Sequence, residues 1–341
     1  MKLINLIIHS ITLFSSTIAA PATLIKNNCG PEYGACDSGY CCSKYNWCGK
    51  TDDHCLLSRG CQSEFGNCSS TSTNEPSTSI NEPTNNKIKW AGYSFPPSGL
   101  NLLSRNPTLS EWMQYIKKFS SHFESDTRSA VLLSVGHEHN EKYCEFLFPQ
   151  PSSIESYSKN IKFEKKNDKY EEFLKACDEN GVDVWLQVEP GSNDLVELAN
   201  ITLIQYGHHS SVKGFGIDLE WWYRVDNSKG KKISDREAQK VVNAVLEFNI
   251  DYTVFIKHWK PDFMPPNYRD HLIFVDNSQG YNNLDNMKKE IRKWAQKFSG
   301  NPVMYQIGYK DDKDIWKNDP IGVAKAVGDT AKKYNDSVKI Q

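Results

Sequence analysis

Eight of the ten cysteines in this chain fall within residues 29–68, and this cluster limits what the segment can fold into. So short a segment cannot bury enough apolar surface to hold itself folded, and an even number of closely spaced cysteines predicts a disulfide framework. Zinc is the weaker interpretation, because zinc sites usually show two separated pairs of ligands and this cluster contains the adjacent Cys41 and Cys42. We therefore expect neither a metal nor another cofactor. The clustered cysteines are Cys29, Cys36, Cys41, Cys42, Cys48, Cys55, Cys61 and Cys68.

Residues 1–20 have the pattern of a secretory signal peptide. Met1 and Lys2 precede an apolar run over residues 3–14, and small residues follow up to Ala20. The run is too short to cross a bilayer, so it predicts export and removal, not anchoring. We expect a secreted protein, extracellular or in the cell wall.

Secretion has two further consequences. Exported thiols rarely stay free, so we expect Cys144 and Cys177 to form a fifth disulfide. The sequons headed by Asn67, Asn200 and Asn335 make the chain a candidate glycoprotein.

The charge balance gives no sign of a polyanionic partner. The chain has 40 basic and 42 acidic residues, a formal net charge of -2. Nucleic-acid and anionic-membrane binders usually show a basic excess, so we expect neither partner. We expect a monomer.

The cysteine order C-x6-C-x4-CC-x5-C-x6-C-x5-C-x6-C, with "GYCCSKYNWCGKTDDHC" at its centre, resembles the hevein-type chitin-binding module. The resemblance places this module at residues 27–68 and implies chitin, or another polysaccharide containing N-acetylglucosamine, as the partner. It implies a sugar platform of one serine and three aromatic residues, at the positions of Ser43, Tyr45, Trp47 and His54; His54 replaces the usual tyrosine. It also implies four disulfides, which are Cys29–Cys42, Cys36–Cys48, Cys41–Cys55 and Cys61–Cys68.

The residue types suit sugar binding without the family. A pyranose ring presents C–H groups that stack on aromatic rings, and its hydroxyl and acetamide groups need a short polar partner such as Ser43. Tyr45 and Trp47 alternate with polar residues, so in an extended segment both rings face the same way. The alternative is that the rings only cover the disulfide knot.

Residues 69–87, "SSTSTNEPSTSINEPTNNK", form a linker rich in Ser, Thr, Pro and Asn. This composition cannot bury enough apolar area to offset the entropy of ordering. We expect a tether that keeps the following domain close to a bound polymer.

Residues 88–341 alternate between apolar, strand-like runs and amphipathic segments. About eight such repeats predict a parallel sheet and an α/β fold of the (β/α)8 barrel type. A doubly wound open sheet is the alternative, although no glycine-rich dinucleotide loop supports it. The chain stops on the eighth run, so the closing helix is absent or the sequence is truncated. The runs cover residues 88–95, 130–137, 182–190, 212–222, 252–259, 271–278, 302–309 and 337–341, and the amphipathic segments cover 109–123, 170–180, 194–206, 234–248, 284–298 and 321–334.

The fourth run, "VKGFGIDLEWW", carries the candidate catalytic groups. Alternation along a strand turns Phe215 toward the helices and directs Asp218 and Glu220 into the barrel near its mouth. Two carboxylates on one partly buried face repel each other, which raises the pKa of one and suits it to general acid catalysis.

This run resembles the DxxDxDxE signature of glycoside hydrolase family 18, the chitinases. Asp218 and Glu220 occupy its last two acidic positions, whereas Lys213 and Gly216 replace the first two. The resemblance implies that Glu220 protonates the glycosidic oxygen. It implies that Asp218 holds the 2-acetamido group during substrate-assisted hydrolysis of β-1,4 N-acetylglucosamine polymers.

Other readings stay open for the residues at the strand ends. The pair Asp218 and Glu220 could be structural, which would make the chain a non-catalytic, lectin-like chitin-binding protein with a degenerate barrel. Glu189 could be a second catalytic carboxylate beside Glu220 in a glycosidase acting on another polysaccharide. His137 and His139 fall on one side of a strand, but a metal site would need a third ligand. Further candidate sugar contacts are Trp221, Trp222, Trp259 and Tyr281, and the tryptophans could equally be rim packing.

Overall fold

The computed structural model forms two compact units, Met1–Glu82 and Pro83–Gln341. The expected signal peptide, Tyr45 and most of the expected linker lie outside the described residues. Within the described residues, no helix is both long and apolar enough to cross a bilayer. The structure describes residues 29–31, 33–44, 46–50, 52–70, 87–95, 107–335 and 338–340.

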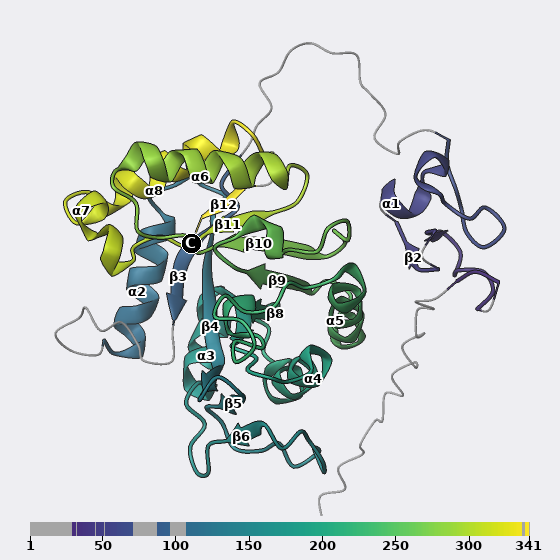
Figure 1. Cartoon of the computed structure of the whole chain (residues 1–341), viewed down its shortest axis with the longest axis horizontal. Helices are drawn as coiled ribbons and strands as arrows, with labels where there is room; N and C mark the ends of the chain where they lie inside the picture. The colour runs from purple at the N-terminus through teal and green to yellow at the C-terminus, as the bar shows by residue number, and fades with distance from the viewer. Residues whose placement is uncertain are drawn as a thin grey trace, which may run out of the picture. The chain divides into compact units, whose positions relative to one another are not determined.

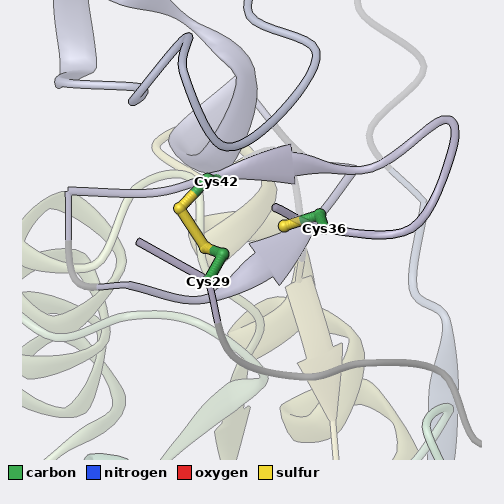
Figure 2. Close-up of side chains that lie close together, drawn as sticks. All are labelled: Cys29, Cys36 and Cys42. Atoms are coloured by element: carbon green, nitrogen blue, oxygen red, sulfur yellow. A yellow bond between two sulfur atoms is a disulfide. The ribbon is translucent and has the colours of Figure 1, made fainter. Parts of the chain in front are cut away.

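The small unit is held by four disulfides around very little regular structure. Strands β1 (Cys41–Cys42) and β2 (Cys48–Gly49) pair antiparallel, and the short helices α1 (Asp52–Cys55) and η1 (Leu57–Arg59) follow. Figure 2 shows one of the disulfides, with a third cysteine beside it. The sulfurs are all bonded in pairs, so none of these eight cysteines offers a thiolate to a metal. The pairs are Cys29–Cys42, Cys36–Cys48, Cys41–Cys55 and Cys61–Cys68, as the hevein-type resemblance implies.

The large unit contains a ten-stranded, mostly parallel sheet. Eight strands run parallel and lie side by side in chain order, and each overlaps one of the eight predicted apolar runs. The remaining two, β5 (Tyr143–Phe146) and β6 (Ile161–Phe163), extend the sheet beyond the end of β4, which the sequence analysis does not predict. The eight are β3 (Trp90–Phe95), β4 (Arg128–His139), β7 (Asp183–Val188), β8 (Val212–Asp218), β9 (Thr253–Lys257), β10 (Leu272–Asp276), β11 (Val303–Tyr305) and β12 (Val338–Ile340).

The helices lie around the outside of the strands (Figure 1). Side-chain caps fix where several begin: Thr108 and Ser234 each form a capping box with a glutamate three residues later. The connection from β9 to β10 has only the 3-10 turn η3 (Pro261–Phe263), in a stretch where prolines disfavour a helix. The helices are α2 (Leu109–Ser120), α3 (Glu171–Asn180), α4 (Leu195–Tyr206), α5 (Asp235–Phe248), α6 (Leu284–Lys297) and α8 (Pro320–Lys332), with the short η4 (Lys310–Asp312) and α7 (Lys313–Trp316) before α8.

The sheet has two apolar faces, because alternate residues along each strand point in opposite directions. The helix face, represented on β8 by Phe215 and Ile217, joins the large core formed with the helices. The inner face forms a separate, smaller core. Its buried residues are Ala130, Leu132, Trp185, Phe255, Ile273, Val275 and Met304.

The expected fifth disulfide is absent, because Cys144 and Cys177 are both free and buried. Cys144 lies on β5, where its sulfur sits 3.0 Å from a Cβ built on Gly136, and Cys177 lies on α3. Each thiol is enclosed by apolar side chains of the large core. Burial raises the pKa of both thiols, to about 12 for Cys177, so neither is a reactive thiolate.

One of the three sequons lies in the core. Asn335 is 1% exposed, and its side-chain amide donates to the carbonyl oxygens of Phe298 at 2.9 Å and Asn301 at 3.0 Å. That amide is occupied and enclosed, so the folded protein cannot carry a glycan there. Asn67 is exposed.

Candidate functional site

The centre of the site is an ion pair between neighbouring strand ends. Asp218 ends β8 and lies opposite Lys257, which ends β9. Lys257 Nζ is 2.8 Å from Asp218 Oδ2, and the two side chains are only 6% and 4% exposed. The other oxygen of Asp218 accepts the backbone N–H of Glu220 at 3.3 Å. Asp218 is therefore an enclosed, paired carboxylate.

Glu220 lies just beyond the strand. β8 ends at Asp218 and continues as the 3-10 turn η2 (Leu219–Trp221), so strand alternation does not set the direction of the Glu220 side chain. Its Oε2 accepts from Asn277 Nδ2 at 3.4 Å, and the residue is partly exposed. Burial, followed by the charge of Asp218, raises the pKa of Glu220. Glu220 is thus an accessible carboxyl group that holds its proton to higher pH than an ordinary glutamate.

Glu189 supplies a second carboxyl group at the same edge of the sheet. It follows β7, and its Oε2 accepts the backbone N–H of Glu138 at 2.9 Å. Burial, and next the charge of Asp218, raise the pKa of Glu189 to about 7. The charge of Asp218 therefore acts on both glutamates, Glu189 and Glu220.

Several polar side chains complete the site, and the sequence analysis misses them. Lys257 Nζ donates to Gln306 Oε1 at 3.5 Å. Buried oxygens of Gln187, Glu138 and Asn277 have no hydrogen-bond partner within the described part of the chain. Buried acceptors of this kind are costly unless water or a ligand donates to them, so they suit a ligand rich in hydroxyl groups. The sequence does carry one signal for Lys257: it is a lysine inside an apolar run, two residues after Phe255, which places both side chains on the same face of the strand.

Gly216, one of the two positions that depart from the DxxDxDxE pattern, has no room for a side chain. A Cβ on Gly216 would lie 2.1 Å from Cζ of Phe255, whose ring fills the inner face at this level. An aspartate cannot occupy this position unless that ring moves. Lys213, at the other replaced position, donates to the Ser210 carbonyl oxygen at 2.7 Å near the opposite end of β8.

The candidate sugar platforms divide into two groups. Trp222 is 3% exposed and its indole N–H donates to the Asn193 carbonyl oxygen at 3.1 Å, so it is a packing residue and not a platform. Trp221, Trp259 and Tyr281 are partly exposed. The guanidinium of Arg224 lies 4.2 Å from the centre of the Trp221 ring, and the ammonium of Lys260 lies 4.6 Å from that of Trp259.

In the small unit, the loop between β1 and β2 positions the candidate sugar contacts. The Trp47 N–H donates to Ser43 Oγ at 3.3 Å, and Trp47 is partly exposed. Asn46 has a φ of 68°, so the loop is a turn and not the extended segment expected from residue alternation. His54 is 7% exposed and its ring lies against Gly49, where a Cβ would come within 2.5 Å, so its ring is not an exposed platform.

Residues 28–68 match the family model described as "Chitin recognition protein". The segment is 49% identical over 37 residues to pseudo-hevein of Hevea brasiliensis, which covers 82% of that protein and 10% of this chain. Through this segment, the chain belongs to the chitin recognition protein family. The chitin recognition module is also 44% identical over 55 residues to Morintide mO2 of Moringa oleifera, covering 67% of it and 16% of this chain. It is 50% identical over 54 residues to an endochitinase of Solanum tuberosum, covering 15% of this chain and only 16% of that enzyme.

Solved structures resemble the α/β unit weakly. A protein from Bacteroides thetaiotaomicron assigned as an alpha-L-fucosidase superposes with a TM-score of 0.45 at 13% identity, over 79% of this chain and 90% of that one. A beta-glucuronidase from Parabacteroides merdae superposes with a TM-score of 0.35 at 13% identity, over 58% of this chain and 22% of that one. Neither likeness decides the fold or the function.

The metal-ligand groupings within the described residues include neither His137 nor His139.

Proposed function

We propose that the protein is a secreted, chitin-binding glycosidase that hydrolyses β-1,4 bonds between N-acetylglucosamine units. The chitin recognition module supports the choice of polymer, because Trp47 is a partly exposed aromatic ring positioned by a disulfide-held turn. The α/β unit supports the reaction, because two carboxyl groups with raised pKa lie at the carboxyl ends of its strands. In parallel α/β proteins this edge of the sheet carries the chemistry.

We propose Glu220 as the general acid. The single observation that carries this role is that Glu220 is partly exposed yet has a raised pKa beside the Asp218–Lys257 ion pair. A proton donor must reach the glycosidic oxygen and must still hold its proton at the working pH. Asn277 orients the carboxyl group from the end of β10, which is separated from β8 by β9.

Asp218 is better suited to positioning than to contact with substrate. Its two oxygens are engaged by Lys257 and by the backbone N–H of Glu220, and the residue is 3% exposed. Its negative charge instead raises the pKa of Glu220 and Glu189. A substrate-assisted mechanism would require Asp218 to leave Lys257. We therefore propose Glu189 as the second reacting carboxyl group.

One observation favours a second assignment of the same two groups. The pKa of Glu189 is raised to about 7, so near neutral pH Glu189 is itself a candidate for the proton donor, with Glu220 as the other reacting carboxyl group. A substrate whose leaving group needs no proton distinguishes the two assignments. The variant of the proton donor, Glu220→Gln in the first assignment and Glu189→Gln in the second, should keep its activity on that substrate.

The α/β unit is proposed to be a closed (β/α)8 barrel. In support, the eight parallel strands follow chain order, and the last strand, β12, lies next to the first, β3. The small core on the inner face would then be the barrel interior.

The function is tested by product release from soluble N-acetylchitooligosaccharides. The wild-type protein should release shorter sugars, and Glu220→Gln and Glu189→Gln should each reduce the rate at least about a hundredfold, the usual size of a lost acid or base. If the wild type releases nothing, chitin hydrolysis is ruled out, which leaves a chitin-binding lectin with a degenerate α/β unit or a glycosidase acting on another polysaccharide.

A further inference from the structure

A cluster of metal-ligating side chains lies apart from the strand ends described above. Glu171 is in the first turn of α3, and His208 and His209 lie in the turn that joins α4 to β8. One ligand atom from each of the three lies within 4.8 Å of the others. We propose that these three side chains bind a divalent transition-metal ion, with Zn²⁺ as the best fit because two imidazoles and one carboxylate are ligands that it prefers.

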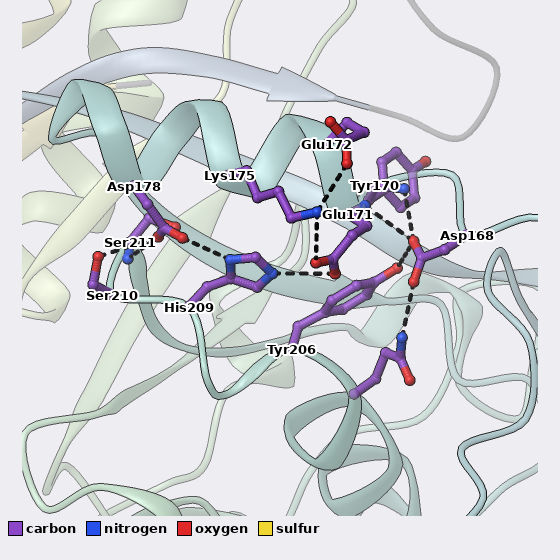
Figure 3. Close-up of polar contacts among 11 residues, drawn as sticks. Asp168, Tyr170, Glu171, Glu172, Lys175, Asp178, Tyr206, His209, Ser210 and Ser211 are labelled. Carbon is purple, nitrogen blue, oxygen red and sulfur yellow. Dashed lines mark hydrogen bonds and ion pairs between the residues drawn. The ribbon is translucent and has the colours of Figure 1, made fainter. Parts of the chain in front are cut away.

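Asp178 prepares His209 for this role. His209 is 5% exposed, and its Nδ1 lies 2.7 Å from Asp178 Oδ2 (Figure 3). Asp178 is itself fixed by the backbone N–H of Ser211 at 2.7 Å and the hydroxyl of Ser210 at 3.3 Å. A carboxylate accepts, so Nδ1 carries a proton, and in the neutral imidazole Nε2 then keeps its lone pair. A carboxylate that orients a histidine in this way is the usual outer partner of a zinc ligand.

The lone pair of His209 points toward another acceptor. His209 Nε2 lies 3.3 Å from Glu171 Oε2. Two acceptors face each other at this distance only when a cation, a proton or a metal ion, sits between them. Two ligands bound at about 2.0–2.1 Å in a tetrahedron lie about 3.3 Å apart, which matches the separation here.

His208 supplies the third ligand from the solvent side. It is exposed, and its ring centre lies 4.2 Å from that of His209. Because one ligand is exposed, the fourth position is open to water, and the ion can enter from solvent. The site therefore predicts a reversible metal ion that ties α3 to the start of β8.

The positive charge of Lys175 opposes the metal. Its Nζ lies 3.4 Å from Glu171 Oε1 and 2.9 Å from Glu172 Oε1, and its side chain is 52% exposed. The lysine can stay with Glu172 while Glu171 binds the metal through Oε2. Removing this charge should tighten metal binding, so Lys175→Gln should bind the metal with higher affinity than the wild type.

The test is Zn²⁺ binding to the full secreted chain without an affinity tag, measured by competition with a chromogenic chelator. The wild type should bind one Zn²⁺ that His208→Ala and Glu171→Gln weaken at least about tenfold. Lys175→Gln should bind more tightly than the wild type. His122→Ala, which removes another exposed histidine, at the end of α2, should bind as the wild type does.

Two results would overturn the proposal. One is a wild type that takes up no Zn²⁺ when the ion is in excess, which would mean that the three side chains do not form a metal site. The other is an equal effect of His208→Ala and His122→Ala. Because His208 is exposed, its variant should fold, and its circular dichroism spectrum should match that of the wild type. Co²⁺ provides a second readout, since tetrahedral coordination gives intense visible absorption that His208→Ala should lose.

Discussion

Lys257 Nζ lies 2.8 Å from Asp218 Oδ2 at the ends of two neighbouring strands, and both side chains are almost fully buried. This ion pair organises the site. It engages the Asp218 carboxylate, and it keeps a negative charge that acts on two glutamates with raised pKa. The pair also has consequences for stability that do not depend on the proposed reaction.

Removing one partner of the pair should be strongly destabilising. Lys257→Met leaves the buried carboxylate of Asp218 without a counter-charge, and we expect a loss of about 3–5 kcal/mol in the free energy of unfolding. Chemical denaturation measures it. The matched control is Lys232→Met, which breaks an exposed ion pair with Asp262 and should cost less than about 1 kcal/mol. Similar losses in the two variants would mean that the Lys257 pair is not enclosed.

The stability of the α/β unit should depend on the protonation of Glu189. Its pKa rises from an ordinary 4.5 to about 7 on folding, so the folded chain holds this proton more tightly than the unfolded chain. The free energy of unfolding should therefore fall as the pH rises from about 4.5 to about 7. Glu189→Gln cannot ionise. The stability of the wild type relative to this variant should decline across the window and level off above it, and a difference independent of pH would contradict the raised pKa.

Gly216 should tolerate no side chain. Gly216→Ala places a Cβ 2.1 Å from Cζ of Phe255, and overpacking of this kind costs about 1–3 kcal/mol. Thermal unfolding should show the loss, and the second substitution Phe255→Leu should recover part of it by vacating the space. An unchanged melting temperature in Gly216→Ala would show that the Phe255 ring does not fill this position.

Retention on chitin should depend on Trp47. Trp47→Ala removes the described aromatic ring on the loop between β1 and β2, and central aromatic contacts commonly carry about 2 kcal/mol or more, so binding should weaken at least about tenfold. Pull-down on insoluble chitin at several protein concentrations gives the affinity. Tyr33→Ala removes an aromatic residue of the same unit that is 47% exposed but lies outside this loop, and it should bind as the wild type does. Equal retention of all three proteins would remove Trp47 from the binding surface.

The strands could be predicted because their signal is local. Buried parallel strands read as short apolar runs, and each of the eight predicted runs overlaps one strand. The hairpin partner β5 and its neighbour β6 were missed, since Tyr143–Phe146 and Ile161–Phe163 are too short to show a period. The prediction that Cys144 and Cys177 form a disulfide is wrong. It rests only on the oxidising environment of exported proteins, which does not indicate whether two thiols lie close together.

The site could be predicted only in part, because its central interaction joins two strands. The sequence indicates Asp218 and Glu220 as candidates, because they are acids within an apolar run. The role of Lys257 depends on the register of β8 and β9, which places it opposite Asp218. The prediction that Glu220 points into the barrel assumes strand alternation. The turn that begins after Asp218 ends that alternation. The buried oxygens of Gln187 and Asn277 were invisible in the sequence, since amides at strand ends are common and only burial makes them unusual.

The most direct test of the account compares two substrates in Glu220→Gln. In a chitooligosaccharide the leaving group is a sugar hydroxyl, which needs a proton to depart. In a dinitrophenyl chitobioside the leaving group is dinitrophenolate, which departs without one. If Glu220 is the proton donor, Glu220→Gln should lose at least about a hundredfold in rate on the first substrate and much less on the second. A loss of the same size on both substrates, with Glu189→Gln keeping its rate on the dinitrophenyl glycoside, would contradict the role of Glu220 and give it to Glu189.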